Sequence, residues 1–104
     1  MTYKKIAQQI EQLRHALVIH GWCQCYRRNA LGQYCIMGAL VDHVDAEYRT
    51  SVMEYIKRQI TLDAAWDGSE SVALWNDAPQ RTFRQVFDML TRAMTECRRQ
   101  GESL

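Results

Sequence analysis

The chain has 104 residues, of which 47% are hydrophobic and 24% are charged, and its formal net charge at neutral pH is +1. This length is typical of one domain, residues 1–104, that can bury a core without disulfides or a structural metal. The near-zero charge argues against nucleic-acid binding driven by bulk charge, and no uncharged run is long enough to span a bilayer. The first ten residues lack the apolar core of a secretion signal, so we expect a cytoplasmic protein with no membrane partner.

The first predicted helix covers residues 3–20. Its apolar residues recur at three- and four-residue steps and form one stripe: Tyr3, Ile6, Ile10, Leu13 and Leu17. Thr2 is a suitable N-cap, and Gly21 can adopt the left-handed conformation that stops a helix.

The helices are expected to fold around residues 21–40, which hold three of the four cysteines. Residues 22–26 alternate in polarity, which fits either a short extended segment or a buried helical turn. A loop at 27–32 leads to residues 33–43, whose nearly continuous apolar character predicts a central buried helix. Gly38 weakens such a helix by about 1 kcal/mol, so we expect a neighbouring helix to approach closely there.

Residues 45–62 form the next predicted amphipathic helix, with Asp45 as its N-cap. A long ordered loop follows, in which Pro79 disfavours helix at the preceding residue. Thr82 and Gln85 have the spacing of a capping box that opens the last helix, which is expected to end at Gly101. The pattern predicts an all-α fold, a compact bundle of about four helices with one long ordered loop before the last.

Two sequence motifs in this chain carry a resemblance to a known family. They are G-W-C-Q followed by G-x-x-C-I-M-G-A-L, and W-N-D-A-P-x-R-T-x-x-x-V further along. Over about residues 22–40 and 75–90 this pairing resembles a family of small proteins of bacteria and their phages whose function is unknown. The family commonly has an acidic residue where this chain has Asn29, so carboxylate chemistry is not implied there. The resemblance implies the fold and a phage association, and it implies no activity.

The cysteines allow three interpretations besides core packing. A metal centre would draw its ligands from Cys23, Cys25, Cys35 and either His20 or His43, although the paired C-x-x-C spacing of a zinc site is missing. Cys35, near a predicted helix start, could be a nucleophile if a histidine served as its base. A disulfide is the third. Core packing is favoured, above all for Cys97 on the last apolar stripe, so we predict no metal, no cofactor and no catalytic residue.

The segment between Arg58 and Arg81 contains no Lys or Arg and could present a negative face. With its tryptophans it is the candidate partner-binding surface, comprising Asp63, Trp66, Asp67, Glu70, Trp75, Asp77 and Arg81. The structural alternative is that Asp77 and Arg81 pair across the proline turn while Asn76 caps backbone groups of the loop. Arg27 and Arg28 could contact phosphate, but a solvated loop is the favoured interpretation of that pair.

These observations favour a small accessory protein without enzymatic activity that binds a host or phage protein. The phage resemblance suggests an inhibitor of a host defence system such as CRISPR interference. Two alternatives remain open. One is a Cys/His metal protein or small enzyme built on Cys23, Cys25 and Cys35, and the other is a DNA-binding accessory protein.

Overall fold

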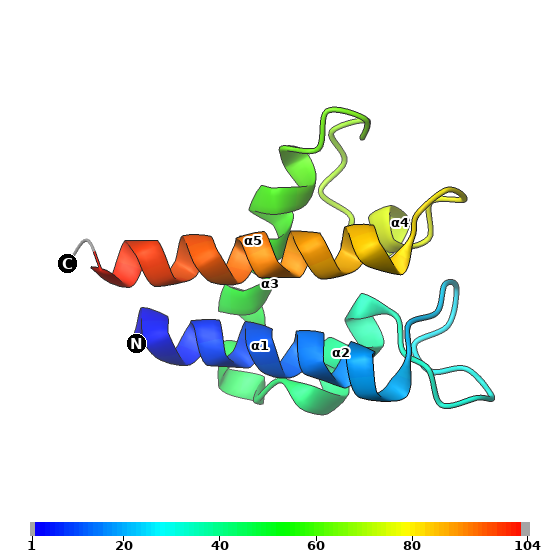
Figure 1. The fold of residues 1–104 in the computed structure, drawn as a ribbon, viewed down its shortest axis with the longest axis horizontal. Helices are drawn as coiled ribbons and strands as arrows, with labels where there is room; N and C mark the ends of the chain where they lie inside the picture. Colours follow the sequence, from blue (N-terminus) through cyan, green and yellow to red (C-terminus); the bar gives the residue numbers. More distant parts are fainter. Residues whose placement is uncertain (1, 103–104) are drawn as a thin grey trace.

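Five α-helices and one 3-10 turn lie within residues 2–102, the part of the chain that this computed structural model describes. They are α1 (Tyr3–His20), α2 (Ile36–His43), η1 (Ala46–Tyr48), α3 (Arg49–Thr61), α4 (Val72–Asn76) and α5 (Phe83–Glu102). α1 and α5 lie side by side and antiparallel, and α3 crosses behind them (Figure 1). The predicted all-α fold is confirmed. No helix of these residues is long and apolar enough to cross a membrane.

The two long helices pack together through the apolar stripes that the sequence predicts. Ile10, Leu13 and Leu17 of α1 are fully buried, as are Val86 and Leu90 of α5. Each such side chain contributes about 1.5–3 kcal/mol by leaving water. The core therefore lies along the α1–α5 seam, closed from behind by α3.

Helix caps appear where the sequence predicts them. The Lys5 amide donates to Thr2 Oγ1 at 3.3 Å, and Gly21 ends α1 at a φ of 91°. In the capping box, the Gln85 amide donates to Thr82 Oγ1 at 3.2 Å and the Thr82 amide donates to Gln85 Oε1 at 3.0 Å. The last helix passes through Gly101 and ends one residue later than predicted.

The helix predicted over residues 33–43 begins only at Ile36, because Tyr34 takes part in backbone pairing. The Tyr34 amide donates to the Gly21 carbonyl and the Cys23 amide donates to the Tyr34 carbonyl, both at 2.9 Å. Isolated bridges join Tyr34 to Trp22 and Arg28, so residues 22–26 do not form a helical turn. Only the start of the segment is extended, because Gln24 and Cys25 lie in a bend and Cys25 has a φ of 71°.

Two further differences concern the middle of the chain. Asp45 does not cap a continuous helix, because its carboxylate accepts from Gln9 Nε2 at 3.1 Å, and α3 starts after η1 at Arg49. The predicted long loop contains the additional short helix α4, capped by Ser71 Oγ, which accepts from the Leu74 amide at 3.2 Å. Propensity alone does not reveal a five-residue helix, since so short a segment depends on its cap and its packing.

The close neighbour of Gly38 is a loop and not the helix that we expected. A Cβ at this position would lie 1.9 Å from the Arg27 carbonyl oxygen. The Cys35 amide donates to the same oxygen at 3.3 Å. The loop before α2 is therefore held directly against the first turn of that helix.

Candidate functional site

Asn76 joins the two sequence motifs at the end of the molecule away from the termini. Its side chain is fully buried. Asn76 Oδ1 accepts from Trp22 Nε1 at 2.8 Å and from the Ile36 amide at 3.1 Å. Asn76 Nδ2 donates to the Cys23 carbonyl at 3.2 Å and to Asp77 Oδ1 at 2.9 Å. One side-chain amide thus provides hydrogen-bond partners for the first residue of α2 and for the G-W-C-Q segment, which is a structural role.

The neighbours of Asn76 extend the same junction. Gln24 Nε2 donates to the carbonyls of Asn76 and Ala78, at 3.1 and 2.8 Å. Asp77 Oδ1 accepts from the Cys25 amide at 2.9 Å. The G-W-C-Q segment is therefore docked onto the W-N-D-A-P segment by hydrogen bonds that span more than fifty residues of sequence.

The predicted pairing of Asp77 with Arg81 is wrong, because Arg81 turns the other way. Arg81 Nη1 lies 3.5 Å from Asp63 Oδ2, and Arg81 Nε donates to the Trp75 carbonyl at 2.8 Å. The guanidinium carbon lies 3.7 Å from the centroid of the Trp75 ring. Only 8% of the Arg81 side chain is exposed, so this stack is held largely out of water.

The Asp63–Arg81–Trp75 cluster forms one wall of a pocket of about 420 Å³ between the end of α3, α4 and the first half of α5. Its lining residues are Gln59, Leu62, Asp63, Trp75, Arg81, Gln85, Asp88 and Arg92. Three of the seven predicted partner-binding residues therefore meet in one place. Trp75 is only 2% exposed, so it shapes the inner wall of the pocket and offers little surface of its own.

The rim of the pocket consists of residues that the sequence analysis missed. Asp88 and Arg92 are one helical turn apart on the polar face of α5, and that i, i+4 spacing is the signal that could have found them. Asp88 pairs with Arg84 at 3.2 Å. Arg92 makes no ion pair with another residue of the described chain. Leu62, at the end of α3, is 74% exposed.

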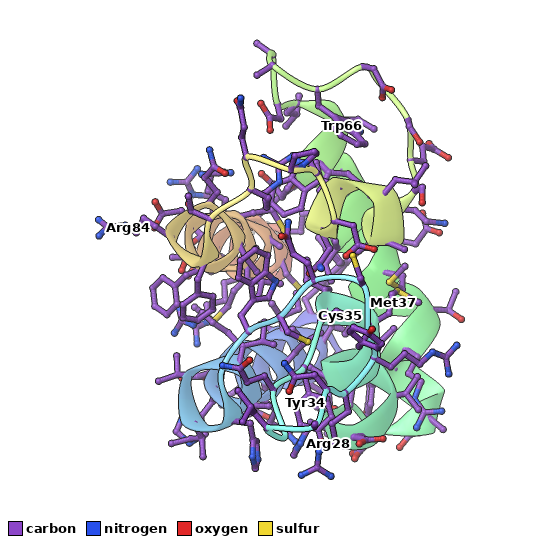
Figure 2. All side chains as sticks on the ribbon, turned by 90° about the vertical axis from the view of Figure 1, so that its right-hand side faces the viewer. Arg28, Tyr34, Cys35, Met37, Trp66 and Arg84 are labelled. Atoms are coloured by element: carbon purple, nitrogen blue, oxygen red, sulfur yellow. The ribbon has the colours of Figure 1, made fainter. Side chains whose placement is uncertain are left out.

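The other acidic residues of the predicted surface lie outside this pocket. Trp66 is half-buried, and its Nε1 donates to the Ser69 carbonyl at 2.7 Å. Asp67 and Glu70 are exposed on the segment between α3 and α4. Figure 2 shows this segment arching over Trp66 at one edge of the molecule. Asp77 belongs instead to the junction at Asn76.

Arg27 and Arg28 are exposed on the loop before α2. Figure 2 shows Arg28 at the edge opposite Trp66. The Arg28 guanidinium lies over the Tyr34 ring, 5.0 Å from its centroid, and Figure 2 shows the two together. Tyr34 Oη donates to Asp42 Oδ2 at 2.8 Å. Arg28 is thus partly engaged within the molecule, whereas no hydrogen bond or ion pair of the Arg27 side chain is found in residues 2–102.

The four cysteines are free thiols, of which Cys25 is exposed and the other three are buried, and Cys35 lies near enough to Cys23 to act on it electrostatically. Burial raises the pKa of Cys23 and of Cys97, which opposes the thiolate that metal binding and nucleophilic attack require. Cys35 Sγ accepts from the Gly38 amide at 3.3 Å as the cap of α2. Within residues 2–102 no group of three or more His, Cys, Asp or Glu side chains is placed to hold a metal ion.

A family model, described as a family of unknown function, matches residues 1–96. The chain belongs to the DUF6197 family. The predicted resemblance to a family of unknown function is thus confirmed, and the match extends well beyond the two motifs. No curated protein and no solved structure matches the chain. In this DUF6197 protein the two motif segments on which the resemblance rested are the segments that dock at Asn76.

The Asp63–Arg81 pair predicts how acid affects this DUF6197 protein. Burial raises the pKa of Asp63, but hydrogen bonds from the Ala65 amide and Trp75 Nε1 and the charges of Arg81 and Arg92 outweigh it, so the pKa lies below its ordinary value. A lowered carboxyl pKa stabilises the fold above the unfolded value of about 4, and this contribution is lost as the pH falls through the folded value.

We therefore expect Asp63→Asn to lower the free energy of unfolding by about 1–2 kcal/mol at pH 7. The difference from wild type should vanish at the acid end of a series of urea titrations between about pH 7 and pH 2. Asp67→Asn is the matched control, because Asp67 is exposed and an amide retains the acceptor for the Ser69 amide. A difference for Asp63→Asn that persists at the lowest pH would contradict this assignment.

Proposed function

We propose that this DUF6197 protein acts by binding another protein through the face that carries the pocket. This pocket surface consists of Leu62, Asp63, Trp75, Arg81 and Arg92. The observation that carries the proposal is the combination of a preformed hollow, an apolar residue at its rim and an arginine without an ion-pair partner among residues 2–102. Aromatic and arginine side chains around a recess are the groups that dominate binding energies at protein interfaces.

The wall of the pocket supports this proposal because it is ordered before any partner arrives. Arg81 is fixed by Asp63, by the Trp75 carbonyl and by the Trp75 ring. A binding surface that is already ordered loses less conformational entropy on association. The ion pair engages Asp63 with Arg81, and the charge of Arg92 also acts on the Asp63 carboxylate. Arg92 itself is exposed and makes no ion pair within residues 2–102. We expect a partner that supplies a carboxylate to Arg92 and an apolar side chain to Leu62.

A more specific proposal concerns which protein is the partner. The phage resemblance noted from the sequence favours a host protein, and an inhibitor of a defence system such as CRISPR interference is the form of accessory factor that we propose. On this hypothesis Asp67 and Glu70 extend the contact beyond the pocket, as the acidic character of their segment suggests.

The test is capture from host lysate by the tagged full chain, followed by affinity measurement with the purified partner. Leu62→Asp and Arg92→Glu should each weaken binding by about tenfold or more while leaving the melting temperature unchanged, since both side chains are exposed. Ile19→Asp is the matched control, because Ile19 is also a largely exposed aliphatic residue, at 63%, and lies outside the pocket.

Equal binding by Leu62→Asp, Arg92→Glu and Ile19→Asp would remove the pocket surface from consideration. Reversal of Asp67 and Glu70 to lysine tests the extended contact separately. If the captured protein belongs to a defence complex, inhibition of that complex by wild type and not by Arg92→Glu would support the finer proposal.

A further inference from the structure

We propose that two copies of this chain associate as a symmetric dimer. In this dimer the basic loop of each copy, residues 26–31, lies against the acidic connector of the other, residues 66–74. The inference uses neither Leu62 nor Arg92 of the pocket surface, but it shares Asp67 and Glu70 with the extended contact proposed above. The Arg27/Arg28 variants and the mixing experiment below distinguish the two proposals. It rests on the distribution of charge, on exposed apolar side chains and on the positions of the two segments.

Charge is segregated along the chain although the net charge is only +1. Residues 12–41 contain no Asp or Glu, and residues 59–80 contain no Lys or Arg. The exposed members of each segment make no ion pair within residues 2–102: these are Arg27 and Arg28 on one side, and Asp67 and Glu70 on the other. Arg28 lies over the Tyr34 ring but has no acidic partner there. Each copy therefore carries two exposed patches of opposite charge that are complementary to those of a second copy.

Both segments also expose large apolar side chains. In the basic loop Leu31 is 82% exposed and Tyr26 is 66% exposed, and in the acidic connector Leu74 on α4 is 61% exposed. An interface needs an apolar centre within its charged rim, because exposed ion pairs alone contribute little. Leu31 and Leu74 are the residues that can provide this centre.

Internal hydrogen bonds hold the conformation of the basic loop, so the loop does not have to become ordered when a second copy binds. Asn29 Oδ1 accepts from the amides of Leu31 and Gln33, at 3.1 and 2.9 Å. Asn29 Nδ2 donates to Gln33 Oε1 at 2.8 Å. The Gly38 contact with the Arg27 carbonyl fixes the base of the loop to α2. Such pre-organisation lowers the entropic cost of association.

The positions of the two segments fit a two-fold axis. Figure 1 shows the basic loop at the end of the molecule away from the termini and the acidic connector projecting above α5, between the middle of the molecule and that end. In the end-on view of Figure 2, Trp66 marks the upper edge and Arg28 the lower edge. In the proposed dimer a two-fold axis relates the two copies, so that the contact between basic loop and connector forms twice and the assembly closes.

A second copy fits these features better than a nucleic acid does. Single-stranded nucleic acid is bound by basic grooves with several exposed aromatic rings. In this loop Tyr26 is exposed, but Arg28 covers the ring of Tyr34, and the exposed Leu31 offers no stacking surface. Nucleic acid also leaves the acidic connector without a partner.

The test is sedimentation velocity of the purified full chain over a range of protein concentrations, in low salt and at about 0.5 M salt, where charge interactions are screened within a few ångströms. We expect a monomer–dimer equilibrium that shifts toward monomer in high salt. Arg27→Glu/Arg28→Glu should weaken dimerisation more than about tenfold. Asp67→Asn/Glu70→Lys, which keeps the acceptor for the Ser69 amide, should do the same.

The decisive measurement is a mixture of these two variants. Each alone should be monomeric, but together the reversed loop of one faces the reversed connector of the other, so an equimolar mixture should recover the dimer. Arg27→Lys/Arg28→Lys keeps the charge and should dimerise like wild type, and far-UV circular dichroism confirms that every variant is folded. A wild-type chain that is monomeric in low salt, a dimer indifferent to both reversals, or a mixture that stays monomeric would overturn the proposal. A salt-sensitive shift that appears only when a single-stranded oligonucleotide is added would assign the loop to nucleic acid instead.

Discussion

Replacing Asn76 by alanine should lower the free energy of unfolding by about 3–5 kcal/mol, the largest effect that we expect from any single polar side chain in this protein. The amide is fully buried and makes four hydrogen bonds. Alanine would leave the Trp22 indole, the Ile36 amide and the Cys23 carbonyl without partners. Each buried group left unpaired costs about 1–3 kcal/mol, which is a large part of the stability of a small domain.

Urea denaturation of wild type and variant measures this change. Asn29→Ala is the matched control, because Asn29 also makes several hydrogen bonds but is only half-buried in the basic loop. Water can replace its lost bonds, so we expect a cost of about 1 kcal/mol there. Similar losses for the two variants would show that Asn76 does not hold the junction as we describe.

Gly38→Ala should destabilise the protein by about 3 kcal/mol or more. In a helix that packs against nothing, the same substitution should stabilise by about 0.5–1 kcal/mol, so the two interpretations differ in sign. The new Cβ would lie 1.9 Å from the Arg27 carbonyl oxygen and 2.6 Å from its carbon, which are backbone atoms that cannot rotate away. The loop must therefore move off α2 or the helix must shift.

Thermal unfolding measures the loss of stability in Gly38→Ala. Hydrogen exchange of the Cys35 amide tests whether the loop has moved, since this amide donates to the Arg27 carbonyl. Gly68→Ala separates steric overlap from backbone strain. Gly68 has a φ of 89° but no atom within 4 Å of an added Cβ, so about 1 kcal/mol of conformational strain is expected. A stable Gly38→Ala protein with unchanged exchange at Cys35 would refute the close contact.

The long amphipathic helices could be predicted because their signals are local. The stripe from Ile6 to Leu17 and the capping box at Thr82 each lie within a few residues, and both formed as expected. The segments that were predicted less well depend on distant partners. Asp45 has the sequence of an N-cap, but Gln9 engages it from α1, thirty-six residues away.

The candidate site was also predicted only in part from the sequence. The sequence placed Asp63, Trp75 and Arg81 in one candidate surface by residue type, and the structure brings them together. It assigned the wrong acidic partner to Arg81, because Asp77 is nearer in sequence while Asp63 is nearer in space. Arg92 was missed because, in the sequence, it cannot be distinguished from the other polar residues on the solvent-facing side of an amphipathic helix. Its place beside the pocket depends on the end of α3, which packs nearby only in the folded protein.

By itself, the sequence determined the helical class, the extent of the two long helices and the family resemblance, since periodicity, caps and motif spacing are properties of neighbouring residues. Only the tertiary structure decided that Asn76 joins the two motifs, that Gly38 serves a backbone contact, and which side chains border the pocket. Those features depend on contacts between residues that are far apart in the chain. Hydrogen bonds and steric fit over such separations are fixed when the helices pack, and no local pattern encodes them.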